Sequence, residues 1–168
     1  SGGLDSAKEK FTRVLEFDET SPLAMFYLAE VYRMQGNKSA AEHGYRRAMQ
    51  ADRRLAGPRF RLAQICQQRN EVTAALEFLR SEIDLGVEDH EVLGTMGWMF
   101  IEMLAHEDAV RCFLLAMEQD NSHSNIFFGL GMALAGKGEY SGALLTLRQA
   151  LRLSPGKPQI LLCAAWLC

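Results

Sequence analysis

The sequence predicts an all-α protein built from pairs of helices that recur every 34 residues. Three observations support this fold class. Small and large residues alternate in register at that interval along the whole chain. Within each interval apolar residues follow the spacing of a helix, and glycine or proline falls between the helical stretches. The 168 residues are also enough to bury one continuous core.

Seven positions carry the repeat. In the first complete interval they are Leu28, Ala29, Tyr32, Gly36, Ala41, Tyr45 and Ala48. Steps of 34 residues then lead to Leu62, Ala63, Cys66, Asn70, Ala75, Leu79 and Glu82; to Met96, Gly97, Phe100, Leu104, Ala109, Phe113 and Ala116; and to Leu130, Gly131, Leu134, Gly138, Ala143, Leu147 and Ala150. Leu104 departs from the turn glycine and Glu82 from a small residue, but the period continues through both.

The elements follow from this period. We expect half a repeat over 1–21, complete repeats over 22–55, 56–89, 90–123 and 124–157, and another half over 158–168. Ser21 is expected to cap the first helix of 22–55 with its hydroxyl, ahead of Pro22. Gly36-Asn37 and Gly138-Glu139 are expected to form turns between helices.

Small residues are expected where helices approach closely. Ala29, Ala63, Gly97 and Gly131 lie at the contact between the two helices of a repeat. Ala41, Ala75, Ala109 and Ala143 lie at the contact between neighbouring repeats. A leucine at any of these positions would overpack the contact, at a cost of roughly 1–3 kcal/mol.

This period and pattern resemble the tetratricopeptide repeat (TPR). The resemblance covers the whole chain and implies a single domain, a solenoid of antiparallel helix pairs that forms a right-handed superhelix. A terminal repeat of such an array normally has a polar outer face, whereas residues 158–168 are almost entirely apolar. We therefore expect the chain to be a fragment of a longer protein that continues past Cys168, or this end to be covered by another chain.

The resemblance also implies a concave groove lined by fixed positions of the first helix of each repeat. Carried onto this sequence, these positions predict the partner-binding residues Phe26, Glu30, Arg33, Phe60, Gln64, Trp98, Ile101, Phe128, Met132 and Trp166. Gly94, Ala135 and Gly136 would leave room for pockets beside the aromatic residues. The alternative is that these side chains pack between neighbouring first helices.

An apolar groove with aromatic anchors suits an extended peptide or a partner helix. The sequence thus predicts a protein-binding scaffold or adaptor, of the kind that bacterial type III secretion chaperones of this repeat family represent. Heat-shock co-chaperones of the family bind a peptide carboxylate through lysine, asparagine and arginine, whereas these positions are chiefly Phe, Gln, Trp and Met here, with glutamates that add negative charge. The alternatives are a self-assembling scaffold, with the protein as a homo-oligomer, and the regulatory or targeting arm of a larger enzyme.

Composition excludes several other classes. A net charge of −3 gives no basic face for nucleic acid. No apolar stretch reaches the length of a membrane span, so we expect no membrane insertion. The cysteines, Cys66, Cys112, Cys163 and Cys168, show no metal-like spacing; buried thiols at Cys66 and Cys168 favour a reducing compartment, the cytoplasm.

Two further clusters of charged residues are candidate binding sites. Six arginines, Arg46, Arg47, Arg53, Arg54, Arg59 and Arg61, could hold an acidic partner but are expected to form a solvated cluster near a helix end. The acidic run around His90 is expected to be a helix N-terminus rather than a cation site. The four histidines show no spacing typical of catalysis or metal binding, so we expect neither an enzyme nor a cofactor.

Overall fold

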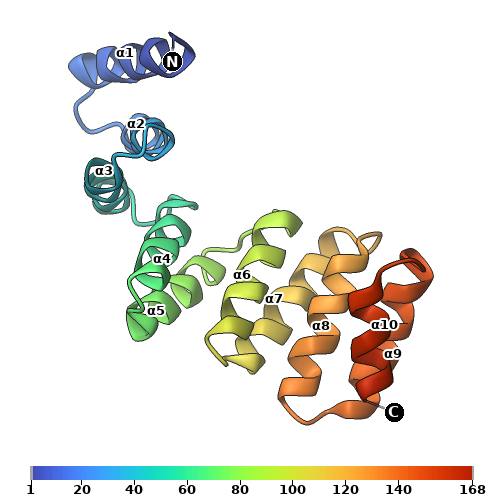
Figure 1. Ribbon diagram of the computed structural model, residues 1–168. Coiled ribbons are helices and arrows are strands. Elements are labelled where there is room, and N and C mark those ends of the chain that lie inside the picture. Colours follow the sequence, from blue (N-terminus) through green and yellow to red (C-terminus); the bar gives the residue numbers. More distant parts are fainter. Residues whose placement is uncertain (1, 168) are drawn as a thin grey trace. The chain divides into compact units, whose positions relative to one another are not determined.

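The computed structural model describes residues 2–167, which form ten α-helices and, over that range, no strand (Figure 1). They cluster into two compact units that divide after Leu85. Unit 1 contains α1 (Gly2–Phe17), α2 (Pro22–Met34), α3 (Lys38–Ala51), α4 (Pro58–Gln68) and α5 (Val72–Ile83). Unit 2 contains α6 (His90–Glu102), α7 (His106–Gln119), α8 (Ser124–Gly136), α9 (Tyr140–Leu153) and α10 (Pro158–Trp166).

Within each unit, the most extensive contacts join two helices that follow one another in the chain. The pairs α2 with α3 and α4 with α5 form in unit 1, and the pairs α6 with α7 and α8 with α9 form in unit 2. In unit 2 the first helices of neighbouring pairs, α6 and α8, also touch. This confirms the all-α architecture of stacked helix pairs. None of the ten helices is long and apolar enough to cross a membrane.

The expected turns form between the helices of each pair. Gly36 and Gly138 adopt left-handed backbone angles, with φ of 79° and 84°. Asn37 then caps α3 by accepting a hydrogen bond from the amide of Ala40. The expected cap at Ser21 is wrong in one respect: Ser21 stands at the N-cap position of α2, but its hydroxyl makes no cap hydrogen bond.

The small residues allow close contacts, as predicted. A Cβ atom on Gly97 would lie 2.7 Å from the ring of Phe113, and one on Gly131 would lie 2.8 Å from Leu147. In α3, Gly44 would place a Cβ atom 2.7 Å from that of Ala29 in α2. Large side chains at these points would separate the helices of a pair.

Cysteine placement partly tests the sequence analysis. Cys66 is buried, as expected, and burial raises the pKa of its thiol. Cys112 is also buried, which raises its pKa to about 12, so neither thiol is reactive at neutral pH. Cys168 lies outside the described residues. The described cysteines Cys66, Cys112 and Cys163 are free thiols.

Candidate functional site

In unit 1 the two predicted groove phenylalanines pack inside the unit. The ring of Phe26 lies 5.8 Å from that of Tyr45 and sits so close to Gly57 that a Cβ atom there would be 3.0 Å away. Phe60 is buried, with 7% of its surface exposed. Both rings thus pack against other side chains of this unit, as the packing alternative expects, and partner binding by Phe26 and Phe60 stays a prediction.

The predicted polar residues of unit 1 form an ion-paired network around Glu30. Its carboxylate contacts Arg33 and Arg61, each at 2.9 Å, and accepts a 2.5 Å hydrogen bond from the Tyr45 hydroxyl. Arg61 also donates to Gln64, at 3.1 Å. Burial by itself raises the pKa of Glu30, but the hydrogen bonds from Arg33 and Tyr45 and the charge of Arg61 outweigh it and lower the pKa. This network ties α2, α3 and α4 together.

The arginine cluster of unit 1 does not share a face. Arg47, Arg53 and Arg54 are exposed, as expected of a solvated cluster. Arg59 departs from this expectation, because it is buried and donates to the backbone carbonyl oxygens of Arg53 and Leu55. Arg46 pairs with Glu42 in its own helix, at 3.0 Å.

In unit 2, Trp98 packs against two phenylalanine rings. The centroid of its ring system lies 5.7 Å from that of Phe113 in an edge-on contact and 5.5 Å from that of Phe128. Phe113 is fully buried, and a Cβ atom on Gly97 or Gly129 would collide with its ring. Trp98, Phe128, Ile101 and Met132 are each half-buried.

Beside Trp98 lies a cleft of about 340 Å³, contained within unit 2. Its apolar part is formed by Gly94, Trp98, Phe113 and Ile126, and its polar part by His90, Glu91, Thr95, His123 and Asn125. Its volume falls at the lower end of the range for ligand pockets.

Gly94 explains why the cleft exists. Steps of 34 residues connect it with Phe26, Phe60 and Phe128. The third complete repeat therefore has a glycine, with no side chain, where the other three have a phenylalanine. A Cβ atom on Gly94 would meet nothing within 4 Å. The room expected beside the aromatic residues is therefore present at this position.

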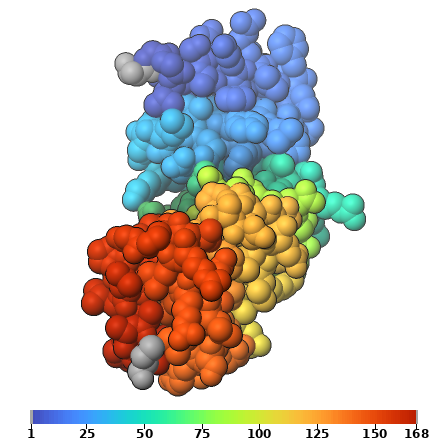
Figure 2. All heavy atoms as spheres, turned by 90° about the vertical axis from the view of Figure 1, so that its right-hand side faces the viewer, coloured from blue at the N-terminus to red at the C-terminus, as the bar shows by residue number. Residues whose placement is uncertain are grey.

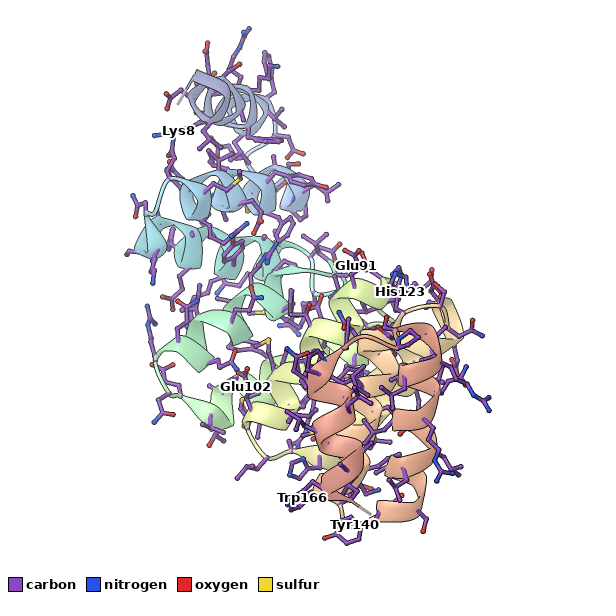
Figure 3. All side chains as sticks on the ribbon, turned by 45° about the vertical axis from the view of Figure 1, so that its right-hand side comes forward. Lys8, Glu91, Glu102, His123, Tyr140 and Trp166 are labelled. Atoms are coloured by element: carbon purple, nitrogen blue, oxygen red, sulfur yellow. The ribbon has the colours of Figure 1, made fainter. Side chains whose placement is uncertain are left out.

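Gly136 and Trp166 do not contribute to the cleft. Gly136 does not leave a pocket, because the imidazole of His106 fills that space and would lie 2.5 Å from a Cβ atom. Trp166 does not line the cleft and is 79% exposed. Figure 3 shows Trp166 and Tyr140 at one end of unit 2, and Glu91 and His123 at the opposite end.

At the polar end of the cleft, two lining histidines and a neighbouring aspartate come together in a way that sequence reasoning missed. His90 begins α6, Asp120 follows α7 and His123 precedes α8, and one ligand atom from each lies within 4.8 Å of the other two. His123 Nδ1 lies 3.2 Å from the Asp120 carboxylate. The two histidines are one residue short of a full repeat apart, and this spacing could have indicated that they meet.

Comparison with known proteins identifies the repeat. The model of the tetratricopeptide repeat matches residues 1–56 and 105–158. No curated protein matches the sequence.

Solved structures with similar folds come from several proteins. YrrB, described as a TPR protein with an unusual peptide-binding site, superposes with a TM-score of 0.73 at 22% identity, over 98% of this chain and 84% of its own. MamA gives a TM-score of 0.73 at 20% identity, over 94% and 92%. PilF of Pseudomonas aeruginosa gives 0.66 at 24% identity, over 98% and 69%. At these identities the similarity establishes the fold.

Proposed function

Because the chain belongs to the tetratricopeptide repeat family, we propose that it is a protein-interaction scaffold whose partner inserts an apolar side chain into the cleft beside Trp98. The observation that carries this proposal is the space at Gly94, bordered by the half-buried Trp98 and the rings it packs on. Aromatic side chains around a concave site provide large contact areas at low entropic cost.

The polar side of the cleft favours a particular kind of partner segment. Glu91 and the Asp120 carboxylate bring negative charge to it. A peptide or helix that places a lysine or arginine beside its apolar anchor would complement this charge, and a segment ending in a carboxylate would be repelled. We therefore expect a basic and apolar segment.

The test is to fill the cleft without removing any existing contact. In the Gly94→Phe variant the third repeat receives the residue that the other three carry, while Gly94→Ala also removes the unfavourable helix propensity of glycine but does not fill the cleft. Peptides selected from a displayed library on the native protein would be titrated against both variants by calorimetry. We expect affinity to fall at least about tenfold in Gly94→Phe, a loss of roughly 1.4 kcal/mol, and to be retained in Gly94→Ala.

Equal affinity of all three proteins, with helicity unchanged by circular dichroism, would place the binding surface elsewhere. A library that yields no binder to the native protein would also count against the cleft.

The finer role that we propose is that of a chaperone or assembly factor, in bacterial secretion or pilus systems and in a reducing, cytoplasmic compartment. The apolar cleft supports it, since such factors shield apolar segments of other proteins. YrrB, a TPR protein with an unusual peptide-binding site, offers a precedent for the same kind of use. We propose that this chain itself is not an enzyme. In the alternative role, as the regulatory or targeting arm of a larger enzyme, it would bind its partner through the same cleft.

A second candidate function is self-assembly, and α10 favours it. Leu161, Leu162 and Trp166 are 50%, 71% and 79% exposed on this short helix. Figure 2 shows the surface of α10, coloured red, uncovered on the face turned to the viewer. A second copy of the chain could cover these side chains, because apolar surface gathered on one element favours association.

A further inference from the structure

We propose that His90, Asp120 and His123 form a binding site for a divalent transition-metal ion at the polar end of the cleft. Two imidazoles and one carboxylate are a donor set that zinc, nickel and copper accept, and three protein ligands leave one position open in a tetrahedral site. This inference goes beyond the proposed function, because it needs neither a peptide nor Trp98.

The geometry is close to that of a metal site. Neighbouring donors around a tetrahedral zinc ion lie about 3.3 Å apart when metal–ligand distances are about 2.0–2.1 Å. His123 Nδ1 and the Asp120 carboxylate are 3.2 Å apart, and the atom offered by His90 lies within 4.8 Å of both. The two imidazole centroids are 4.8 Å apart, which places both rings beside the same carboxylate.

Two features prepare the donors for an ion. His90 Nε2 is buried and has no hydrogen-bond partner among the described residues, an arrangement that calls for a ligand. The Asp120 carboxylate accepts a 2.8 Å hydrogen bond from the amide of Ser122, which fixes its orientation.

The surroundings decide the class of metal. Imidazole donors favour zinc, nickel and copper over magnesium and calcium, which take oxygen ligands. The site opens onto the cleft beside Glu91 and Asn125, whose side chains could orient a bound water.

The test is a zinc titration of the untagged protein, followed by NMR of the histidine side-chain nitrogens. We expect shifts at His90 and His123 and none at His43 or His106, which separates this site from cysteine ligation at Cys163. His123→Ala, at an exposed position, should weaken zinc binding at least about tenfold, and Asp120→Asn should weaken it as well. A tenfold excess of magnesium should not displace the zinc.

His43→Ala is the matched control, since His43 is an exposed histidine of α3 in the other unit. Equal loss of zinc affinity in His43→Ala and His123→Ala, shifts confined to other residues, or unchanged histidine resonances would each overturn the proposal. Gly94→Phe separates this site from the proposed function, because it should weaken peptide binding at least about tenfold and retain the histidine shifts.

Discussion

Residues 36, 70, 104 and 138 occupy one position of the repeat and share one backbone conformation. Gly36 and Gly138 adopt positive φ without a side chain to clash, and Asn70 tolerates it with φ of 60°. Leu104 has φ of 58° although it carries a branched side chain, and that side chain is 78% exposed. The turn therefore enforces the conformation even where the residue is unsuited to it.

This strain predicts that Leu104→Asn stabilises the protein. Asparagine relieves part of the cost of a left-handed backbone, and the exposed leucine contributes little packing, so we expect a gain of about 1 kcal/mol in the free energy of unfolding. Chemical denaturation of the two proteins would measure it. The reciprocal change, Asn70→Leu, should cost a similar amount, and a gain or no change in that variant would contradict the strain argument.

At the scale of elements, the start of α4 depends on a side chain from α5. Glu82 is 1% exposed and accepts a hydrogen bond from the amide of Gly57, just before the first residue of α4. Burial raises its pKa, and the nearby amide groups of Gly57, Phe60 and Arg59 and the charge of Arg59 offset this only in part. Glu82, which stands where the other repeats have alanine, thus serves as a cap for the N-terminus of α4.

Two substitutions at Glu82 separate its hydrogen bond from its charge. Glu82→Ala leaves buried amide groups without an acceptor and should cost about 1–3 kcal/mol. Glu82→Gln keeps an acceptor but cannot ionise. Because the pKa of Glu82 is raised in the folded state, its contribution to stability is fully present below the unfolded pKa and is lost as the pH rises through the folded one. The native protein should therefore lose stability relative to Glu82→Gln as the pH rises above 4.5, the ordinary pKa of a glutamate.

Denaturation curves across this pH range would measure the difference between the two proteins. Parallel pH profiles for the native protein and Glu82→Gln would show that the buried carboxylate does not titrate differently in the two states.

The sequence predicted the elements better than the contacts. Repeat spacing predicted the helix pairs and the turns at Gly36 and Gly138, because turn chemistry and apolar period act locally. It did not show that Phe26 and Phe60 pack inward or that His106 occupies the space beside Gly136. Those outcomes depend on which neighbouring side chain occupies the space between two helices. The helical period of the sequence does not determine this. The proximity of His90 and His123 was likewise not predicted, because it arises from the stacking of helix ends from adjacent repeats.

At the scale of the whole molecule, each unit uses the same repeat positions differently. In unit 1 the phenylalanine position is filled and the polar residues pair with one another, so Glu30 and its arginines serve the fold. In unit 2 the glycine at that position opens a cleft, with titratable groups at its polar end. One difference within the repeat, glycine in place of phenylalanine, thus separates an open cleft from a packed contact.

Surface chemistry at α10 gives the last prediction, which concerns the mass of the protein in solution. If a second copy covers α10, sedimentation velocity should give a mass that is a multiple of 18.8 kDa and persists over dilution. Leu162→Glu places a charge in the contact and should shift the mass towards the monomer, since an unpaired charge in an apolar interface is costly. Leu145→Glu is the matched control, because Leu145 on α9 is similarly exposed, at 66%. A native protein that sediments as a monomer at all concentrations would exclude self-assembly through α10, and equal effects of the two variants would assign the association to another surface.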